Sequence, residues 1–383
     1  MIAPEPRFLP GLELSRTLYE RAVAPLVRGI PHAAALLGPG SEVLGLDTPR
    51  STDHDWGPRL QLFLSHDHAR VHDLLTAHLP ARVHGLPTRF LPFPDDPGSA
   101  RPSDSPEARH RVEVVEPGTW LTALLGFDPR AGVRLTDWLS TPTQRLAEVT
   151  AGAVFHDDLG EIDAARRVLE WYPDDVWRYV LACQWRRIAQ EEPFVGRCAE
   201  VGDHLGERVV TARLVRDLMR LCLLLGRRYP PYSKWLGSVF STLPEAAEVG
   251  PVLHRALVSA TPAVELARAS SLVAALQNRT GLAEPRSTRT RPFHQRPYPV
   301  LGADRFAEAL KARIEDPALA SRPLIGAVDQ YLDGTDVLTR PTTVRGLTTA
   351  VEGARVGPMT TEGPDGGLVP NTGGRATGDA PGR

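Results

Sequence analysis

The amino-acid sequence predicts an α+β protein in which a mixed sheet with flanking helices precedes an all-helical region. Within residues 1–135, short apolar segments with strand alternation are mixed with segments of helical periodicity. After about Thr136 helical periodicity dominates and β-branched alternation disappears. Residues 346–383 contain much Gly, Thr, Pro and Asp but few apolar residues. We therefore expect a first domain at 1–135, a helical domain at 136–345 and a disordered tail at 346–383.

The first domain is expected to place its strands around a turn made of Gly40 and Ser41. Hydrophobic periodicity and breaker residues define its elements. In order, we expect a helix at 11–29, a strand at 33–37, the turn, an extended segment carrying Asp53 and Asp55, a strand at 59–64, a helix at 67–79, a loop at 92–106 and a strand at 111–115.

The helical domain is expected to contain several amphipathic helices joined by short connections. They are predicted at 144–154, 162–171, 174–190, 206–225, 232–240, 251–277 and 304–314, with a long surface loop at 282–299.

Composition limits the range of partners and compartments. The 383 residues carry a net charge of −2, so neither nucleic acid nor an anionic membrane is expected as an obligatory partner. The N-terminal residues lack a basic start followed by an apolar core, and no later run approaches the length of a membrane span. Cys183, Cys198 and Cys222 form no Cys-x-x-Cys pair, which fits free thiols in a reducing compartment. We expect a cytoplasmic protein, and the sequence leaves its oligomeric state open.

The turn and the acidic residues after it favour chemistry on a phosphate. Gly40 allows the backbone to approach a phosphate, and Ser41 with the following amides offers hydrogen-bond donors. In an extended segment, Asp53 and Asp55 point to the same face and present both carboxylates to hard cations. The alternatives are that Ser41 only caps a short helix beginning at Glu42, and that the aspartates are ordinary turn or cap residues.

These motifs resemble those of the nucleotidyltransferase superfamily, which has the polymerase-beta-like fold. Its pattern is Gly-[Gly/Ser], a gap of this length, and Asp-x-Asp on a strand. The resemblance implies a third carboxylate on a later strand, and Glu113 within Arg111-Val112-Glu113-Val114-Val115 fits that place. His54 departs from the pattern, because an apolar residue is usual there.

A narrower resemblance, over most of residues 10–345, is to a bacterial domain-of-unknown-function family placed in that superfamily. The segments that carry it are Gly40-Ser41-Glu42-Val43-Leu44-Gly45, Asp53-His54-Asp55-Trp56-Gly57, Leu125-Gly126-Phe127-Asp128-Pro129 and Arg228-Tyr229-Pro230-Pro231-Tyr232-Ser233-Lys234-Trp235.

The resemblance implies a catalytic site with two Mg²⁺ ions. Asp53, Asp55 and Glu113 are then the metal ligands, with Glu113 serving the second ion or acting as the base. Gly40 and Ser41 are expected to hold the phosphates of ATP or another nucleoside triphosphate.

The helical domain offers a second group of nucleotide contacts. Lys234 is one of only two lysines, and with Tyr232 it could hold a base and a γ-phosphate. The alternative is that Tyr232 and Trp235 are packing residues at the start of a helix.

Two further groups of charged residues are interpreted as structural. His156-Asp157-Asp158 is expected to be a loop between helices. Arg213, Asp217 and Arg220 have the spacing of an intrahelical ion-pair ladder rather than of substrate contacts.

Taken together, these patterns predict an enzyme that moves a nucleoside monophosphate from a triphosphate, ATP by default, to a hydroxyl of a small-molecule or protein acceptor. One alternative is a catalytically silent nucleotide-binding regulatory protein of the same fold. Another is a sugar-nucleotide glycosyltransferase, whose chemistry also uses Asp-x-Asp but does not need the Gly-Ser turn.

Overall fold

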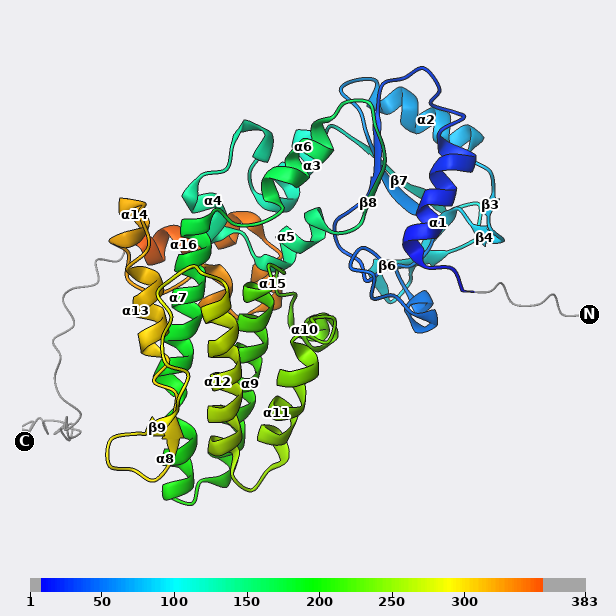
Figure 1. Cartoon of the computed structure of the whole chain (residues 1–383). Coiled ribbons are helices and arrows are strands. Elements are labelled where there is room, and N and C mark those ends of the chain that lie inside the picture. The colour runs from blue at the N-terminus through cyan, green and yellow to red at the C-terminus, as the bar shows by residue number, and fades with distance from the viewer. Residues whose placement is uncertain (1–7, 354–383) are drawn as a thin grey trace, which may run out of the picture.

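The computed structural model describes residues 8–353, in which a six-stranded mixed sheet is joined to a group of long helices (Figure 1). The strands are β1 (Ala33–Leu36), β2 (Arg59–Phe63), β3 (Arg82–Val83), β4 (Leu86–Pro87), β5 (Arg89–Phe93), β6 (Asp96–Pro102), β7 (Arg109–Val115), β8 (Ala153–Asp157), β9 (Arg291–Pro292) and β10 (Pro299–Val300).

The helices lie mainly after residue 116 in the sequence. They are α1 (Gly11–Leu18), α2 (His68–His78), α3 (Pro117–Leu125), α4 (Leu135–Ser140), α5 (Thr143–Thr150), α6 (Glu161–Leu169), α7 (Asp174–Glu191), α8 (Phe194–Glu200), α9 (His204–Leu225), α10 (Ser233–Phe240), α11 (Ala246–Val258), α12 (Pro262–Arg279), α13 (Asp304–Lys311), α14 (Pro317–Ala320), α15 (Thr335–Leu338) and α16 (Pro341–Gly353).

The sheet has the strand order β6-β5-β7-β2-β1-β8. β2 and β7 run parallel, with Gln61 opposite Glu113, and the other neighbours in this sheet are antiparallel. The mixed sheet confirms the expected α+β class. Its last strand, β8, follows α5, so the sheet includes residues from beyond position 135.

Alternation along the strands divides the sheet into two apolar faces. Leu60, Leu62 and Val112 pack with residues of α1 and α2 in one hydrophobic cluster. Phe63 and Leu37 belong to a second cluster, which continues through α3 to α6 into the long helices. Because this cluster is continuous, the sheet and the helices share one packed interior.

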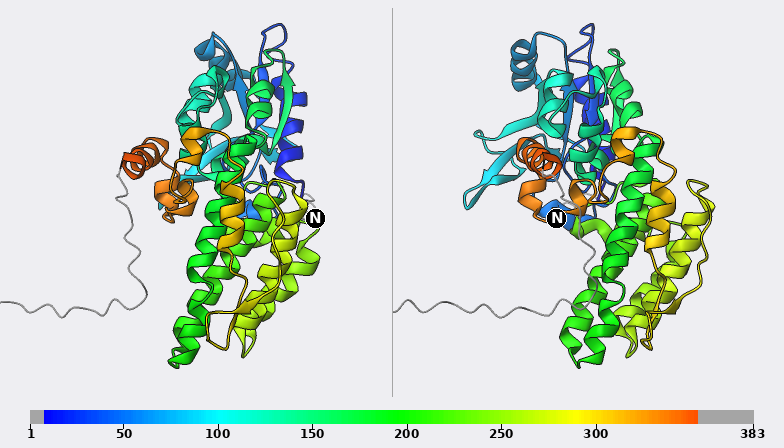
Figure 2. Two further views of the ribbon diagram at one scale, coloured as in Figure 1. Left: turned by 60° about the vertical axis from the view of Figure 1, so that its left-hand side comes forward. Right: turned by 90° about the vertical axis from the view of Figure 1, so that its left-hand side faces the viewer.

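The long helices lie below the sheet (Figures 1 and 2), and large side chains are buried among them. Trp185 of α7 is fully buried, stacks on Phe306 of α13 and donates its indole N–H to Gln277 of α12 at 3.1 Å. α7, α12 and α13 are thus held by packing together with a satisfied buried polar group.

Several predicted elements are wrong in extent. The helix expected at 11–29 consists of α1 and a π-helical turn, Tyr19–Val23. The loop expected at 92–106 is largely the β5–β6 hairpin. The helix expected at 144–154 ends at Thr150, since Gly152 takes a φ of +65° and β8 follows.

Other differences lie in the helical region. The helix expected at 251–277 is two helices, α11 and α12. Between them, the Ser259 side chain forms hydrogen bonds with the backbone and side chain of Thr261. Pro262 then occupies the first position of α12. In the region expected to be a disordered tail, residues 346–353 belong to α16, and the rest of that expectation lies outside the described residues.

Two expectations from the sequence, that no segment spans a membrane and that the cysteines are free thiols, concern the helices. None of the helices in residues 8–353 is long and apolar enough to cross a membrane. Cys183 and Cys222 are buried, Cys198 is half-buried, and all three are free.

Candidate functional site

A cavity of about 800 Å³ lies between the sheet and the helices. One wall is formed by residues 39–59 and by Arg111 of β7, and the facing wall comes from α5, α9, the start of α10 and residues 329–339. This volume is within the range of sites that bind ligands of nucleotide size. Six of the seven predicted site residues line it: Gly40, Ser41, Asp53, Asp55, Tyr232 and Lys234.

The Gly40–Ser41 turn follows β1 and requires glycine at its first position. Gly40 has a φ of +145°, and a Cβ there would meet the Arg59 guanidinium and would lie 2.7 Å from Glu42 Oε2. Arg59 donates to the Pro39 carbonyl at 2.7 Å and pairs with the buried Glu42 carboxylate at 2.7 Å. The Arg59–Glu42 ion pair therefore holds the turn in place.

No helix begins at Glu42. Residues 41–45 form turns, in which Leu46 N–H donates to the Ser41 carbonyl at 2.8 Å. The capping alternative for Ser41 is therefore wrong.

The segment carrying the two aspartates is not extended, contrary to the strand expected there. Pro49–Asp53 is a 3₁₀ helix capped by the Thr48 side chain, and Asp55 has a φ of +49°. Thr48 followed by Pro49 favours the start of a helix. The local sequence therefore determines the conformation of this segment, which precedes β2. The two carboxylates line the cavity through this turn rather than through strand alternation.

Each aspartate has one oxygen engaged and one available. Asp55 Oδ1 accepts from the Ala100 backbone at 3.1 Å and pairs with Arg111 Nη1 at 3.0 Å. Asp53 Oδ1 lies 2.8 Å from Nδ1 of the exposed His54. Within residues 8–353 neither Oδ2 atom has a hydrogen-bond partner, and the Asp53 and Asp55 side chains are 58% and 38% exposed.

Glu113 stands apart from the two aspartates. It is exposed on β7 opposite Gln61, whose amide donates to Glu113 Oε2 at 3.5 Å, and it is not part of the cavity wall. Arg111, two residues earlier, occupies the place beside Asp55. Among the described residues the three carboxylates do not converge within 4.8 Å, so the expected acidic trio is not assembled.

The facing wall presents the start of α10. Tyr232 N–H donates to Gln144 Oε1 of α5 at 3.1 Å, which fixes this segment against α5. Lys234 Nζ lies 4.8 Å from the centre of the Trp235 ring. In the part of the chain described, neither Lys234 nor the cavity residue Arg50 pairs with a carboxylate.

Sequence reasoning missed most of the arginines of this cavity. They form ion pairs whose partners are mostly remote in sequence: Arg59–Glu42 (2.7 Å), Arg145–Glu148 (2.6 Å), Arg216–Asp333 (2.7 Å) and Arg220–Asp329 (3.5 Å).

The expected intrahelical ladder is wrong. Arg213 pairs with Glu191 and Arg220 with Asp329, so the charges of α9 join other elements. Two arginines of the sheet wall could have been found from the sequence, because they lie close to predicted site residues. Arg59 comes four residues after Asp55, and Arg111 comes two residues before Glu113.

A family model described as a domain of unknown function (DUF4037) matches residues 138–236. The match begins in α4 and ends in α10, so it covers much of the facing wall, including Tyr232 and Lys234, but not the Gly40–Asp55 wall. No curated protein and no solved structure matches the chain.

Proposed function

We propose that this protein is a Mg²⁺-dependent nucleotidyltransferase, which transfers a nucleoside monophosphate from ATP or another triphosphate to a hydroxyl of a small-molecule or protein acceptor. The observation that carries the proposal is the convergence of two remote segments on one cavity. Gly40, Ser41, Asp53 and Asp55 lie on one wall, and Tyr232 and Lys234 lie on the other.

The charges of the cavity favour an anionic ligand. Most of its arginines are neutralised by carboxylates, whereas Arg50 and Lys234 have no ionic partner in the described part of the chain. Both cations are exposed at the wall and are available to phosphate oxygens. The Gly40–Ser41 turn adds backbone approach and a hydroxyl donor.

The aspartates suit a metal ion that arrives with the triphosphate. Mg²⁺ is commonly bound by one or two carboxylates together with substrate phosphates, and it retains several waters. Asp53 and Asp55 would hold it through their available oxygens, while Arg111 and the Ala100 amide fix the orientation of Asp55. When bound, the ion would neutralise charge that develops on the phosphates during transfer.

One observation favours the second candidate, a nucleotide-binding regulatory protein without turnover. Glu113, the expected second-metal ligand or base, lies outside the cavity wall, and Arg111 takes the place beside Asp55. This arrangement leaves binding elements in place while the third carboxylate is absent from them.

Labelled ATP distinguishes the candidates. The protein is incubated with Mg²⁺ and either α-labelled or γ-labelled ATP in the presence of hydroxyl-bearing metabolites and a protein extract. Transfer of the α label alone, with release of pyrophosphate, is the expected result. Binding without transfer supports the regulatory candidate. Transfer of the γ label, or no nucleotide binding at all, contradicts the proposed transferase.

A further inference from the structure

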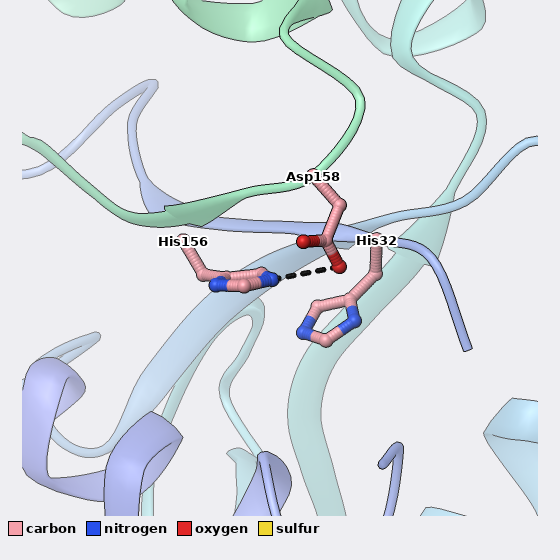
Figure 3. A group of neighbouring side chains, drawn as sticks. All are labelled: His32, His156 and Asp158. Atoms are coloured by element: carbon pink, nitrogen blue, oxygen red, sulfur yellow. Dashed lines mark ion pairs between the residues drawn. The ribbon is translucent and has the colours of Figure 1, made fainter. Parts of the chain in front are cut away.

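Two imidazoles and a carboxylate meet at the edge of the sheet, away from the cavity. His32 precedes β1, His156 lies on β8 and Asp158 follows β8 (Figure 3). Antiparallel pairing places Ala34 opposite His156, and the Asp158 N–H donates to the His32 carbonyl at 3.0 Å. None of the three lines the cavity. The expected loop at 156–158 is wrong, because His156 and Asp157 belong to a strand.

The side chains converge as metal ligands do. His156 Nε2 lies 2.8 Å from Asp158 Oδ2, the two imidazole centroids are 4.6 Å apart, and one donor atom from each of the three side chains lies within 4.8 Å of the others. In a tetrahedral zinc site, ligand bonds of 2.0 to 2.1 Å place neighbouring donors about 3.3 Å apart. Side-chain movements that change the distances between the donor atoms by up to about 1.5 Å therefore bring them to coordination distance.

Hydrogen bonds fix the state of the buried imidazole. His32 Nδ1 lies 2.7 Å from the Ile30 carbonyl oxygen, which can only accept, so Nδ1 carries the proton. The lone pair is then on Nε2, which accepts from the Tyr19 hydroxyl at 2.9 Å. A backbone carbonyl that holds the second ring nitrogen is the usual support of a metal-binding histidine.

No cation from the protein competes for the carboxylate. Within residues 8–353, Asp158 forms its ion pair with His156 and none with arginine or lysine. A second histidine pair, His72 and His110, has ring centroids 4.9 Å apart, but no third donor converges on it in the described chain. The carboxylate distinguishes the first group from an ordinary histidine contact.

We propose that His32, His156 and Asp158 bind one Zn²⁺ ion, which displaces the Tyr19 O–H from the lone pair of His32 Nε2 and leaves a fourth position to water or to the Tyr19 oxygen. Two imidazoles and a carboxylate suit a borderline divalent ion better than Mg²⁺ or Ca²⁺, which prefer oxygen ligands. Because the ligands come from both sides of the β1–β8 pairing, the ion ties β8 to the sheet. The proposal does not depend on nucleotide transfer.

The test uses the untagged full chain, stripped with a chelator and titrated with Zn²⁺ in the presence of excess Mg²⁺, which occupies sites made of carboxylates alone. One bound Zn²⁺ per chain and a higher melting temperature are expected. His156→Phe keeps a ring in place but removes its donors, and Asp158→Asn changes a half-exposed side chain. Each should weaken binding at least about tenfold, which is the lower range for loss of even a supporting group.

His110→Phe is the matched control and should bind Zn²⁺ as the parent protein does. Co²⁺ provides a second measurement on the unmutated chain, since its visible absorption reports nitrogen and oxygen ligands in a low-coordinate site. Absence of stoichiometric Zn²⁺ binding, or unchanged affinity in both His156→Phe and Asp158→Asn, would overturn the proposal.

Discussion

Replacing Asp55 with asparagine separates a binding role from a structural one. The Ala100 amide can still donate to the asparagine oxygen, and asparagine tolerates the positive φ of this position. Only the ion pair with Arg111 is lost, and both of its side chains are more than one-third exposed. Such pairs contribute about 0–1 kcal/mol. In a chain of this size the melting temperature should fall by no more than about 4 °C.

The effect on nucleotide binding should depend on the sign of the charge that is removed. With Mg²⁺, the loss of one carboxylate should weaken binding of a non-hydrolysable ATP analogue at least about tenfold, or about 1.4 kcal/mol. Without Mg²⁺, the same substitution removes a negative charge beside the triphosphate, so affinity should stay the same or increase. Isothermal titration calorimetry with and without Mg²⁺ measures both values.

Asp104→Asn is the control, because Asp104 is also a carboxylate paired with an arginine, Arg82, but lies outside the cavity. It should leave both affinities unchanged. The reasoning is refuted if Asp55→Asn has the same effect with and without Mg²⁺. A loss of stability above about 3 kcal/mol would refute it too, since it would show that Asp55 serves the fold.

Three further predictions concern the turn, the facing wall and pH. Gly40→Ala should cost about 1–3 kcal/mol for its backbone conformation, and more because the new Cβ enters the ion pair behind the turn. Gly29→Ala, which also has positive φ but no atom within 4 Å of a new Cβ, should cost less in urea unfolding. Lys234→Gln should weaken ATP binding about tenfold in the calorimeter and leave stability unchanged, because a charged hydrogen bond is lost from an exposed side chain. The Arg130 side chain lowers the pKa of Asp128, so this carboxylate stabilises the fold above its unfolded pKa of about 3.9 and ceases to do so as pH falls through the lower folded pKa. Asp128→Asn should therefore be about 1 kcal/mol less stable in urea at neutral pH, and the difference should disappear once the pH falls below the lowered folded pKa; a difference that persists in acid contradicts this.

Elements defined by their own periodicity could be predicted from the sequence. β1, β2, β7, α7 and α9 all lie where apolar spacing placed them. β1 and β2 are buried on both faces and α7 and α9 are buried along much of their length, so in these elements the local pattern and the tertiary packing agree.

The β5–β6 hairpin could not be predicted by the same reasoning. Its prolines and glycine suggested a loop, but β6 is an edge strand, where proline costs little because one side of the strand has no partner. β8 was missed because Val154 and Phe155 extended the apolar pattern of the preceding helix. Gly152, whose Cβ would overlap the Leu36 carbonyl, was the overlooked stop signal.

The candidate site was predictable where its residues form local motifs. Gly40, Ser41, Asp53 and Asp55 share one short segment, and all four line the cavity. The facing arginines were not predictable, because Arg220 finds its carboxylate partner more than a hundred residues later, at Asp329. Glu113 was predicted because the resemblance implies a third carboxylate on a later strand, and strand alternation gives the face of that residue but not its position along the strand relative to the cavity.

The central claim is that the cavity binds a nucleoside triphosphate between the Gly40–Ser41 turn and the start of α10. A crystal structure with a non-hydrolysable ATP analogue and Mg²⁺ tests it most directly. We predict phosphates against Gly40 and Ser41, an ion on the carboxylates of Asp53 and Asp55, and Lys234 within reach of a phosphate oxygen. A triphosphate bound elsewhere, or a cavity left empty at saturating nucleotide, would contradict the account.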